Sequence, residues 1–562
     1  MTGQTETGQT AGGPDETVDE IVRRRHGDTH AALLFEDEHW TWDEHVGASA
    51  TRAALACAWR RPGPFHIGYL LENIPELSFW LGAGAVCGAT MVGINPTRRG
   101  AELAADIRHT DCQLLVTERK LLPLLNGLDT GVPRERVLVV DTDEYLEVCA
   151  EHRTTTLPDR RVPADAVALL VFTSGTSGAP KAAIVSQRRL ARYGRILSES
   201  QDLTNDSVCY LAMPMFHSNA LYAGWSPAVY VGATIALRRR FSASGFLDDV
   251  RHYRVTYFNY VGKPLSYILT TPPRPDDREH TLVRVIGNEG TERDIARFSE
   301  RFGVQVADNY GSTEGGVTVM RTLGQPTGAL GRLPDGVLVV DAETGTPCAP
   351  ARFDDAGRLV NPRECIGEIV NSGPSSFEGY YQNDEAAQQR TRNGWYWSGD
   401  LGYVDADGWL WFAGRDYDWL RVDGENFAAA PIERIVGRFP GVVLAAVYAV
   451  PAASVGDEVM VALQLAPRLD FDASAFDDFL ERQPDLGVKW SPGYVRIADE
   501  LPVTATSKVL KRQLRAQRWE CVDPVWWRPE RDAPLRRLTE TDVASIRRAF
   551  KAGGRARELD ER

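Results

Sequence analysis

A glycine-rich stretch between two apolar segments constrains the fold of this chain most strongly. Residues Phe172–Lys181 read Phe-Thr-Ser-Gly-Thr-Ser-Gly-Ala-Pro-Lys, with the apolar segment Ala166–Phe172 before them and Ala182–Ser186 after them. This pattern predicts a tight loop between two strands. Glycines let backbone N–H groups approach an anion closely, hydroxyls donate hydrogen bonds to oxygen, and lysine supplies positive charge. The favoured interpretation is a phosphate-binding loop, and the alternative is a flexible Gly/Ser turn.

This loop departs from the Walker motif of P-loop proteins. Pro180 stands where the second glycine of that motif belongs, and neither Ser nor Thr follows Lys181. A Walker-type nucleotide site is therefore not expected.

The length, net charge and cysteine content of the chain exclude several classes of protein. The chain has 562 residues, more than one core usually holds, so at least two domains are expected. The formal net charge of −14 argues against a general binder of nucleic acid or anionic membranes, and an anionic substrate then needs a local basic pocket. The eight cysteines are scattered without a Cys-x-x-Cys pair, which excludes a disulfide framework or zinc site and favours a reducing compartment.

Two uncharged runs, Leu77–Ile94 and Leu221–Leu237, approach the length of a membrane span. Glycines interrupt both, and each ends in a β-like segment, so each is predicted to be a buried helix followed by a buried parallel strand. Residues 1–14 are polar, do not resemble a secretory signal and are predicted to be disordered. A cytoplasmic protein without stable membrane insertion is expected.

The first half of the chain alternates short strands with helices. This alternation runs from residue 31 to 118, recurs after the glycine loop, and appears again over 282–310. It is typical of mostly parallel sheets covered by helices. The tripeptide Gly-Ala-Thr occurs at both 88–90 and 232–234, which suggests two related subdomains.

The second half changes character twice. Residues 328–412 contain short strands punctuated by Gly and Pro, as in a small β-rich subdomain, and an α+β pattern follows residue 415. The predicted fold is α/β, with a large N-terminal domain (15–415) made of two βαβ-type subdomains and a small β-rich subdomain. A smaller α+β C-terminal domain (416–528) and a charged tail (529–562) complete it.

One further loop has side chains suited to phosphate chemistry. Residues Tyr310–Glu314 follow an apolar strand and so lie at the C-terminal edge of a sheet, where open α/β folds bind ligands. Thr313 can hydrogen-bond a phosphoryl oxygen, and Glu314 can hold Mg²⁺. The alternative is a solvated loop acid.

Two later loops supply a carboxylate and a lysine. Asp400, followed by Gly414 and Arg415, is suited to ribose hydroxyls, and the small-residue loop Pro502–Lys508 ends in a lysine. Taken singly, Asp400 is also explained as a turn residue and Lys508 as a surface lysine.

In this order, the stretches resemble the adenylate-forming superfamily, which comprises acyl-CoA synthetases, peptide-synthetase adenylation domains and luciferases. The resemblance covers about residues 30–515. It rests on Thr173–Lys181, Tyr310–Glu314, Ser398–Asp400, Gly414–Arg415, Gly424–Asn426 and Lys508. Within the superfamily, Gly287–Asn288, Arg421–Asn426 and Val509–Trp519 look most like the fatty-acid transport protein and bacterial fatty-acyl-CoA ligase branch.

The resemblance implies a reaction in two steps. A carboxylate attacks the α-phosphate of ATP to give an acyl-adenylate and pyrophosphate, and a thiol, expected to be that of coenzyme A, then attacks the acyl-adenylate. The small domain is expected to be mobile and to turn about a hinge between the steps. The first step needs neutralised charge and aligned reactants rather than a strong base.

The resemblance also implies roles for individual residues. Lys508 is expected to contact the α-phosphate and the carboxylate, Thr313 and Glu314 to handle the α-phosphate and Mg²⁺, and His217 to act as the gate. Asp400 and Arg415 would bind ribose and Tyr310 would stack near adenine. The expected phosphate-binding residues are Thr173, Ser174, Gly175, Thr176, Ser177, Gly178 and Lys181.

Two positions depart from the family pattern. The hinge position, often Asp or Lys in the family, is Tyr417, so the chain departs from the pattern at the point about which the small domain is expected to turn. Gln187 replaces a histidine that is common after the glycine loop, whereas His217 is retained.

The expected acid pocket is polar and aromatic for a long alkyl chain. We expect a buried carboxylate at Glu289, which requires a cationic or hydrogen-bonding partner. Either a salt bridge to Lys263 or a nearby arginine satisfies it, or it recognises a polar aryl acid. The expected lining residues are Tyr222, Trp225, Tyr260, Lys263, Asn288, Glu289 and Gly311.

Three alternatives to acyl-CoA synthesis remain open from the sequence. The acyl group could pass to a carrier protein, or ATP could activate nitrite for diazotisation of an aromatic amine. A non-catalytic adenylate-binding sensor is the third, and the presence of Lys181, Glu314 and Lys508 together weighs against it.

Overall fold

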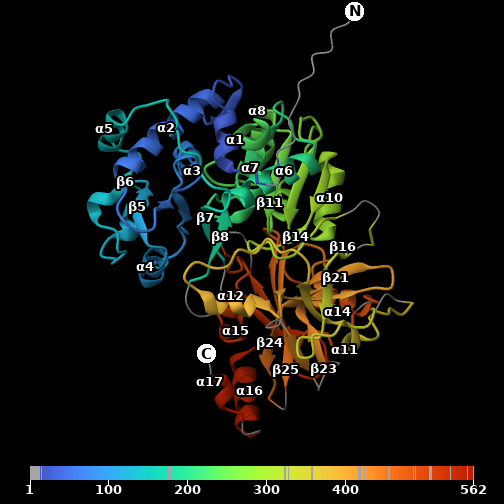
Figure 1. Ribbon diagram of the computed structural model, residues 1–562. Helices are drawn as coiled ribbons and strands as arrows, with labels where there is room; N and C mark the ends of the chain where they lie inside the picture. The colour runs from blue at the N-terminus through green and yellow to red at the C-terminus, as the bar shows by residue number, and fades with distance from the viewer. Residues whose placement is uncertain are drawn as a thin grey trace, which may run out of the picture.

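A computed structural model places a large domain above a C-terminal domain in the view of Figure 1, with the β-rich strands between them. The described residues are 13, 15–173, 180–321, 325–326, 328–355, 359–415, 419–422, 425–453, 456–484, 486–487, 489–504, 509–531, 533–552 and 555–560.

The sheet that carries the glycine loop is mostly parallel and runs in the order β6-β5-β3-β4-β7-β8. Its last two strands are antiparallel neighbours, with Phe172 opposite Ala182, so the predicted strand–loop–strand is confirmed. We call it the first sheet. Its strands are β3 (His66–Leu70), β4 (Thr90–Gly93), β5 (Cys112–Thr117), β6 (Val137–Val139), β7 (Val167–Phe172) and β8 (Ala182–Ser186).

A second sheet runs in the order β13-β12-β11-β9-β10-β1-β2 and contains a strand from the start of the chain. Leu33 in β1 lies opposite Ile235 in β10, so the first predicted βαβ unit gives its first strand to the sheet of the second unit. The strands are β1 (Ala31–Phe35), β2 (Glu38–Thr41), β9 (Val208–Leu211), β10 (Thr234–Leu237), β11 (Tyr257–Val261), β12 (Arg284–Asn288) and β13 (Gln305–Asp308).

Helices cover these sheets and bury the two long apolar runs as predicted. Each run forms a helix that ends at a left-handed glycine, Gly88 (φ 73°) or Gly232 (φ 77°), and then enters a buried parallel strand. Glycine adopts this conformation without a Cβ penalty, so the repeated Gly-Ala-Thr is a helix end joined to a strand start. The helices are α1 (Val18–Arg24), α2 (Trp42–Ala58), α3 (Pro75–Cys87), α4 (Gly100–His109), η1 (Leu122–Leu125), η2 (Arg134–Arg136), α5 (Asp143–Glu151), α6 (Gln187–Ser200), the π-helix η3 (Ala220–Trp225), α7 (Ser226–Val231), α8 (Phe246–His252), α9 (Pro264–Leu269) and α10 (Glu292–Phe302).

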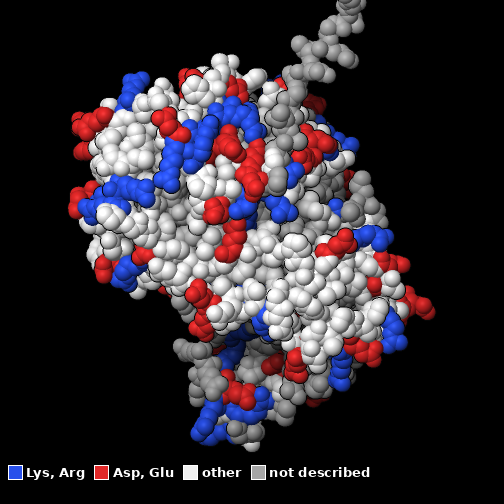
Figure 2. All heavy atoms as spheres, viewed as in Figure 1, with Lys and Arg blue, Asp and Glu red and all other residues white. Residues whose placement is uncertain are grey.

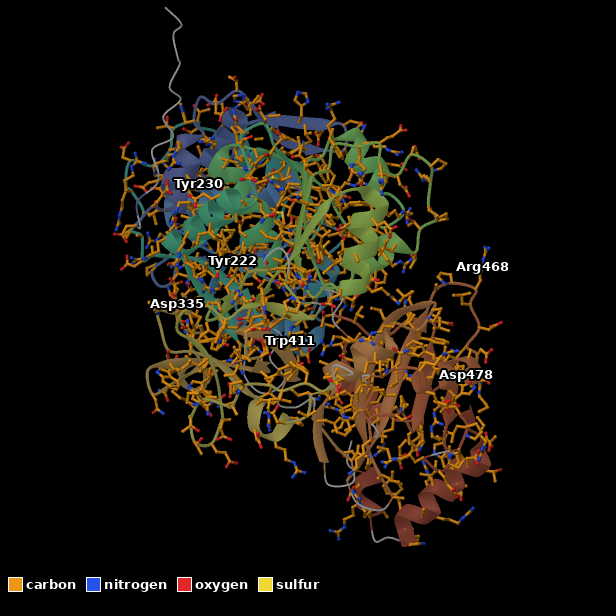
Figure 3. All side chains as sticks on the ribbon, turned by 90° about the vertical axis from the view of Figure 1, so that its right-hand side faces the viewer. Tyr222, Tyr230, Asp335, Trp411, Arg468 and Asp478 are labelled. Carbon is orange, nitrogen blue, oxygen red and sulfur yellow. The ribbon has the colours of Figure 1, made fainter. Side chains whose placement is uncertain are left out.

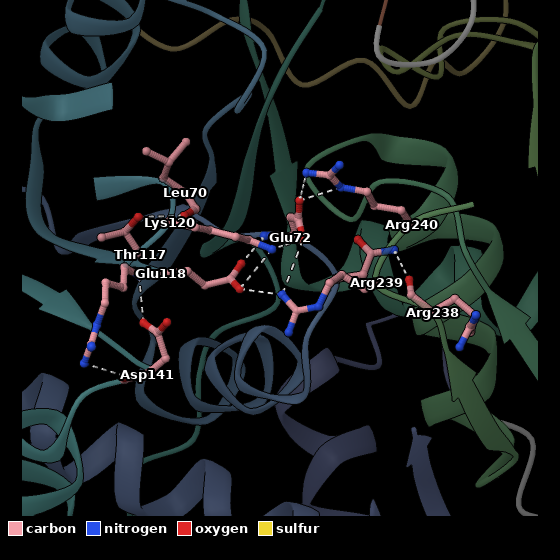
Figure 4. A network of polar contacts seen from close by, with 11 residues as sticks. Leu70, Glu72, Thr117, Glu118, Lys120, Asp141, Arg238, Arg239 and Arg240 are labelled. Carbon is pink, nitrogen blue, oxygen red and sulfur yellow. Dashed lines mark hydrogen bonds and ion pairs between the residues drawn. The ribbon is translucent and has the colours of Figure 1, made fainter. Parts of the chain in front are cut away.

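A charged cluster joins the two sheets where their strands end (Figure 4). Buried Glu72 follows β3 and buried Glu118 follows β5, and both pair with Arg239, which follows β10. Arg240 and Lys120 also pair with Glu72. Because the carboxylates come from the first sheet and the arginines from the second, the cluster fixes the two subdomains against each other.

The β-rich subdomain is an antiparallel sheet in the order β16-β21-β20-β18-β17, with β19 beside β20. Its position between the α/β subdomains and the C-terminal domain brings its loops to the site. The elements are β14 (Tyr310–Gly311), β15 (Thr318–Val319), β16 (Ala329–Arg332), β17 (Val337–Val340), α11 (Pro362–Cys365), β18 (Gly367–Asn371), α12 (Asp384–Arg390), β19 (Thr391–Arg392), β20 (Trp395–Val404) and β21 (Trp409–Arg415).

The C-terminal domain is built on the sheet β24-β25-β26-β27-β28, with the pair β22–β23 beside it. The charged tail supplies β28, and its helix α16 buries Ile546 and Phe550 in the same core as Tyr448. The elements are β22 (Trp419–Val422), β23 (Glu425–Ala428), α13 (Ala429–Val436), β24 (Val442–Pro451), β25 (Asp457–Leu465), α14 (Ala473–Glu481), β26 (Tyr494–Ala498), α15 (Lys511–Gln517), β27 (Val525–Trp527), β28 (Arg536–Arg537), α16 (Glu540–Ala552) and α17 (Arg557–Asp560).

The surface mixes charges of both signs. In Figure 2, Lys and Arg alternate with Asp and Glu over the large domain, and the face shown has no broad patch of one sign among its described residues. Over the described ranges, no helix combines the length and apolar character needed to cross a bilayer.

Candidate active site

One continuous cavity of about 2310 Å³ extends from the large domain to the C-terminal domain. Figure 3 labels three of its lining residues, with Tyr222 in the large domain and Asp335 and Trp411 in the β-rich subdomain. Loops from three parts of the chain meet here, and many of the predicted site residues line this cavity. The predicted residues that line it are Thr173, Lys181, His217, Tyr222, Lys263, Asn288, Glu289, Tyr310, Gly311, Thr313, Glu314 and Asp400.

The two ends of the glycine loop lie in this cavity. Thr173 donates its backbone N–H to the carbonyl of Lys181 at 3.0 Å, which closes the base of the loop. The predicted phosphate-binding residues Ser174, Gly175, Thr176, Ser177 and Gly178 lie outside the described residues, and their roles stay predictions.

Tyr310 and Asp400 meet across the cavity wall. The Tyr310 hydroxyl donates a hydrogen bond of 2.6 Å to Asp400 Oδ2. Burial, and then the neighbouring carboxylate of Asp400, raise the pKa of Tyr310 well above its usual value, so the phenol keeps its proton. In the sheet register Asp400 lies opposite Arg415, and the ribose-binding role of the two residues stays a prediction.

The loop that carries Thr313 and Glu314 is held by hydroxyl groups. Thr313 Oγ1 lies 2.8 Å from Ser218 Oγ, and the Tyr380 hydroxyl donates to Glu314 Oε1 at 2.7 Å. Glu314 is buried, with 6% of its surface exposed. The side chains of Thr313 and Glu314 are thus each held by a hydrogen bond.

The loop that carries His217 is fixed from the first sheet. The Asn73 side chain donates to the Met213 carbonyl at 2.9 Å and accepts from the Met215 N–H at 2.9 Å. The Tyr69 hydroxyl donates to the Met215 carbonyl at 3.1 Å. These contacts set the position of His217, which lines the cavity.

Two predicted pocket residues lie behind the wall rather than in it. Trp225 is 1% exposed and donates to Ser78 Oγ at 2.9 Å, and the fully buried Tyr260 donates to Asp308. Neither lines the cavity. Tyr260 lies beneath Gly287, where a Cβ would come within 2.3 Å of its ring.

The expectation that Glu289 is buried is wrong. Glu289 directly follows β12 and has a left-handed backbone (φ 69°), and its side chain is exposed in the cavity. It stands at the cavity wall together with Lys263 and Asn288.

The described residues on either side of the predicted catalytic lysine line the same cavity. Lys508 lies outside the described residues, as does the predicted hinge residue Tyr417, and the structure describes only the backbone of Arg415. Thr504 and Val509, on either side of residues 505–508, both line the cavity.

Sequence reasoning missed the residues that orient the site. Tyr380 follows Gly379 in an aromatic-rich turn within the β-rich segment, and its Gly-Tyr-Tyr pattern was the available signal. Arg189 was missed because it lies in a run of arginines on α6, although Tyr193 follows it one helical turn later. No sequence pattern around Asn73 indicates its role, because its hydrogen-bond partners are more than a hundred residues away in the chain.

The donor set fits ATP with Mg²⁺. Mg²⁺ is usually held by one or two carboxylates together with substrate phosphates, and the carboxylate of Glu314 lines the same cavity as the base of the glycine loop. Among described side chains, no cluster of three or more His, Cys, Asp or Glu could hold a metal without the nucleotide.

A cleft that combines a glycine-rich loop, a buried glutamate and a Tyr–Asp pair beside a second domain defines a nucleotide-binding enzyme. The sequence profile of the AMP-binding enzyme family matches residues 19–381. The chain belongs to this family of AMP-binding enzymes.

Full-length relatives are acyl-CoA ligases by name. The chain is 48% identical over 547 residues to the steroid-22-oyl-CoA synthetase of Rhodococcus jostii (strain RHA1), covering 97% of this chain and 99% of that protein. It is 47% identical over 513 residues to the medium/long-chain-fatty-acid–CoA ligase FadD17 of Mycobacterium tuberculosis, covering 91% and 98%. The predicted resemblance to the bacterial fatty-acyl-CoA ligases is confirmed.

The fold matches solved structures of the same kind. ATP-bound MatB from Rhodopseudomonas palustris aligns with a TM-score of 0.76 and 22% identity, covering 88% of this chain and 98% of that one. The predicted large and small domains of an adenylate-forming fold are thereby confirmed.

Proposed function

We propose that the chain converts a bulky carboxylic acid into its coenzyme A thioester through an acyl-adenylate. The observation that carries the proposal is the meeting, in one cavity, of the glycine-loop base, Glu314, Asp400 and the two ends of the Lys508 segment. The names of the relatives support coenzyme A as the acceptor.

The first step transfers an adenylyl group. A carboxylate oxygen of the acid forms a bond to the α-phosphorus, the bond from that phosphorus to the bridging oxygen breaks, and pyrophosphate leaves. In the second step the sulfur of coenzyme A forms the thioester, AMP leaves and the thiol proton passes to solvent. No oxidant or reductant is involved.

This chain's residues act on that chemistry by placement. The Tyr310–Asp400 pair is suited to position the ribose, and Thr313 to donate to the α-phosphate. Mg²⁺ held by Glu314 would neutralise phosphate charge, which is the main requirement of such a step. Lys508 is proposed to bring positive charge to the reacting oxygens.

The cavity wall supports an acid with a large rigid skeleton that carries oxygen substituents, such as a steroid with a carboxylated side chain. The aromatic ring of Tyr222 and the apolar Val261 give flat contact, while Lys263, Asn288 and Glu289 offer polar contacts. An unsubstituted long alkyl chain would leave these polar groups unmatched. The preference for polar or cyclic acids over long alkyl acids is thus part of the proposal.

Product masses test the proposal. The enzyme is incubated with ATP, Mg²⁺ and coenzyme A and with a panel of steroid side-chain, aryl and alkyl acids. We expect AMP, pyrophosphate and an acyl-CoA, with steroid acids ranked first. Arms with a phosphopantetheinyl carrier protein, or with nitrite and an aromatic amine, would overturn the assignment if only they gave product.

A Glu289→Gln variant tests the acid preference in the same panel. We expect the rate of thioester formation with oxygen-substituted acids to fall relative to the rate with alkyl acids. An unchanged ranking would remove Glu289 from substrate recognition and leave the reaction class intact.

A further inference from the structure

A buried arginine forms a hydrogen bond with the loop that carries Thr313 and Glu314, which we call the catalytic loop. Arg189, on α6, is 3% exposed and lies at the cavity wall. Its Nη2 donates to the carbonyl of Thr313 at 2.7 Å, and its Nη1 donates to the carbonyl of Ile184 in β8 at 2.9 Å. One guanidinium thus connects the strand after the glycine loop to the loop that carries Thr313 and Glu314.

An aromatic pair extends this support to the acid pocket. The rings of Tyr193 and Tyr222 stack with centroids 4.4 Å apart and planes 9° apart, and the Arg189 guanidinium carbon lies 5.7 and 5.8 Å from them. The Tyr222 hydroxyl donates to the Thr313 carbonyl at 3.3 Å. Tyr222 therefore contacts the catalytic loop and lines the cavity at the same time.

The loop has no room to move toward this support. Gly315 has a φ of 67°, and a Cβ there would lie 2.3 Å from the Tyr193 hydroxyl and 2.7 Å from Arg189 Nη2. The main chain after Glu314 is thus in close contact with both side chains.

The Arg189 charge is only partly compensated by described residues. The carboxylate of Glu378 interacts favourably with it, but no salt bridge joins it to a described acid, and its Nε has no hydrogen-bond partner among the described residues. Burying a charge is costly. An anion in the adjoining cavity would offset more of that cost, and the reacting carboxylate and phosphates are such anions.

We propose that Arg189 is a positioning residue that holds the Thr313–Glu314 loop against the reacting phosphate and links it, through Tyr222, to the acid pocket. This inference rests on the proposed function, because it assigns Arg189 to the adenylate-forming step. The thiol-transfer step does not need the Mg²⁺-phosphate alignment and depends on Arg189 less.

The test measures the two half-reactions separately. Arg189→Met keeps the length of the side chain and removes its charge, Arg189→Lys restores the charge, and Tyr222→Phe removes only the second donor. Arg188→Ala is the control, because Arg188 is exposed on the same helix and pairs with Asp15. Adenylation is followed by pyrophosphate exchange, and thiol transfer by adding synthetic acyl-adenylate and coenzyme A.

We expect Arg189→Met to lower kcat for adenylation at least about tenfold, since small misplacements at a reacting centre have effects of this size. Thiol transfer should change less than about twofold. Arg189→Lys should recover part of the loss, and Tyr222→Phe should raise the KM for the acid with a smaller loss of kcat.

Three results decide the proposal. Equal losses in both half-reactions would assign Arg189 a merely structural role, and melting temperatures identify variants that fail to fold, for which Tyr222→Phe then decides. Unchanged adenylation in Arg189→Met would overturn the proposal. A wild-type enzyme that activates no acid would instead overturn the proposed function.

Discussion

The Tyr310 hydroxyl donates a 2.6 Å hydrogen bond to Asp400, which joins the loop after the second sheet to β20 of the β-rich subdomain. Both residues line the cavity, and Asp400 is 8% exposed. The proposed nucleotide site therefore depends on contact between two subdomains.

Tyr310→Phe should weaken ATP binding more than acid binding. The substitution removes a donor from a buried carboxylate, which costs about 1–3 kcal/mol, so the KM for ATP should rise about tenfold or more while the KM for the acid changes little. Initial rates at varied ATP measure this. Tyr230→Phe is the control, since Tyr230 does not line the cavity and lies apart from Tyr222 in Figure 3; equal effects in both variants would contradict the prediction.

Glu314→Gln should shift the Mg²⁺ dependence of adenylation. The amide keeps an acceptor for Tyr380 but loses the charge, so more Mg²⁺ should be needed and the rate should fall at least about tenfold. Pyrophosphate exchange at increasing Mg²⁺ measures both. Tyr380→Phe should lower the adenylation rate less than Glu314→Gln does. If Glu314→Gln has the same Mg²⁺ dependence as wild type, Glu314 does not bind the metal ion.

Lys508→Ala should lose adenylation at least about tenfold while ATP binding survives. The reason is that the segment's flanking residues, Thr504 and Val509, line the cavity where charge develops. Pyrophosphate release and equilibrium nucleotide binding are the two measurements. A near-normal release rate would refute the assigned role.

Arg293→Ala should weaken the contact between the large domain and the C-terminal domain. The Arg293 guanidinium, on α10 of the large domain, donates to the carbonyls of Gly437 and Val442, the latter at 2.9 Å. Hydrogen bonds from a charged donor contribute about 1.5–3 kcal/mol each, so we expect faster proteolysis between the domains and slower adenylation. Arg297→Ala, exposed one turn further along α10, should behave as wild type; if the two variants match, the contact does not hold the domain.

Asp308→Asn should change how stability depends on pH. Burial raises the pKa of Asp308 to about 6, against about 3.9 in the unfolded chain. The folded state then binds the proton more tightly between pH 4 and 6, so wild type loses stability as pH rises through this window, by up to about 3 kcal/mol.

The asparagine variant has no such proton. The difference in free energy of unfolding, wild type minus Asp308→Asn, should therefore fall from pH 4 to 6 and stay level above it. Urea unfolding at several pH values measures the difference. A difference that rises with pH would show that the carboxylate is stabilised as an anion.

Local patterns predicted the elements, because their causes lie within a few residues. The glycine loop is flanked by short apolar runs, and each of the uncharged runs Leu77–Ile94 and Leu221–Leu237 contains a helix followed by a strand. The order of motifs predicted the nucleotide site for the same reason. Neither inference required knowledge of how distant segments pack.

Contacts between residues that lie far apart in the sequence could not be predicted from local patterns. Trp225 and Tyr260 have the chemistry of pocket residues but face inward, because Ser78 and Asp308 offer partners there. Glu289 follows β12 with a left-handed backbone and an exposed side chain, neither of which a sequence reveals. Arg189 acts on Thr313 from another element, so its role appears only in three dimensions.

The pairing of β1 with β10 has a consequence for synthesis. Leu33 leaves the ribosome long before Ile235, its partner across the sheet. β1 can pair with β2 early, but its other edge must stay without a strand partner until nearly half of the polypeptide has emerged. Truncated chains that end before β10 should expose this edge of β1 and be prone to aggregation.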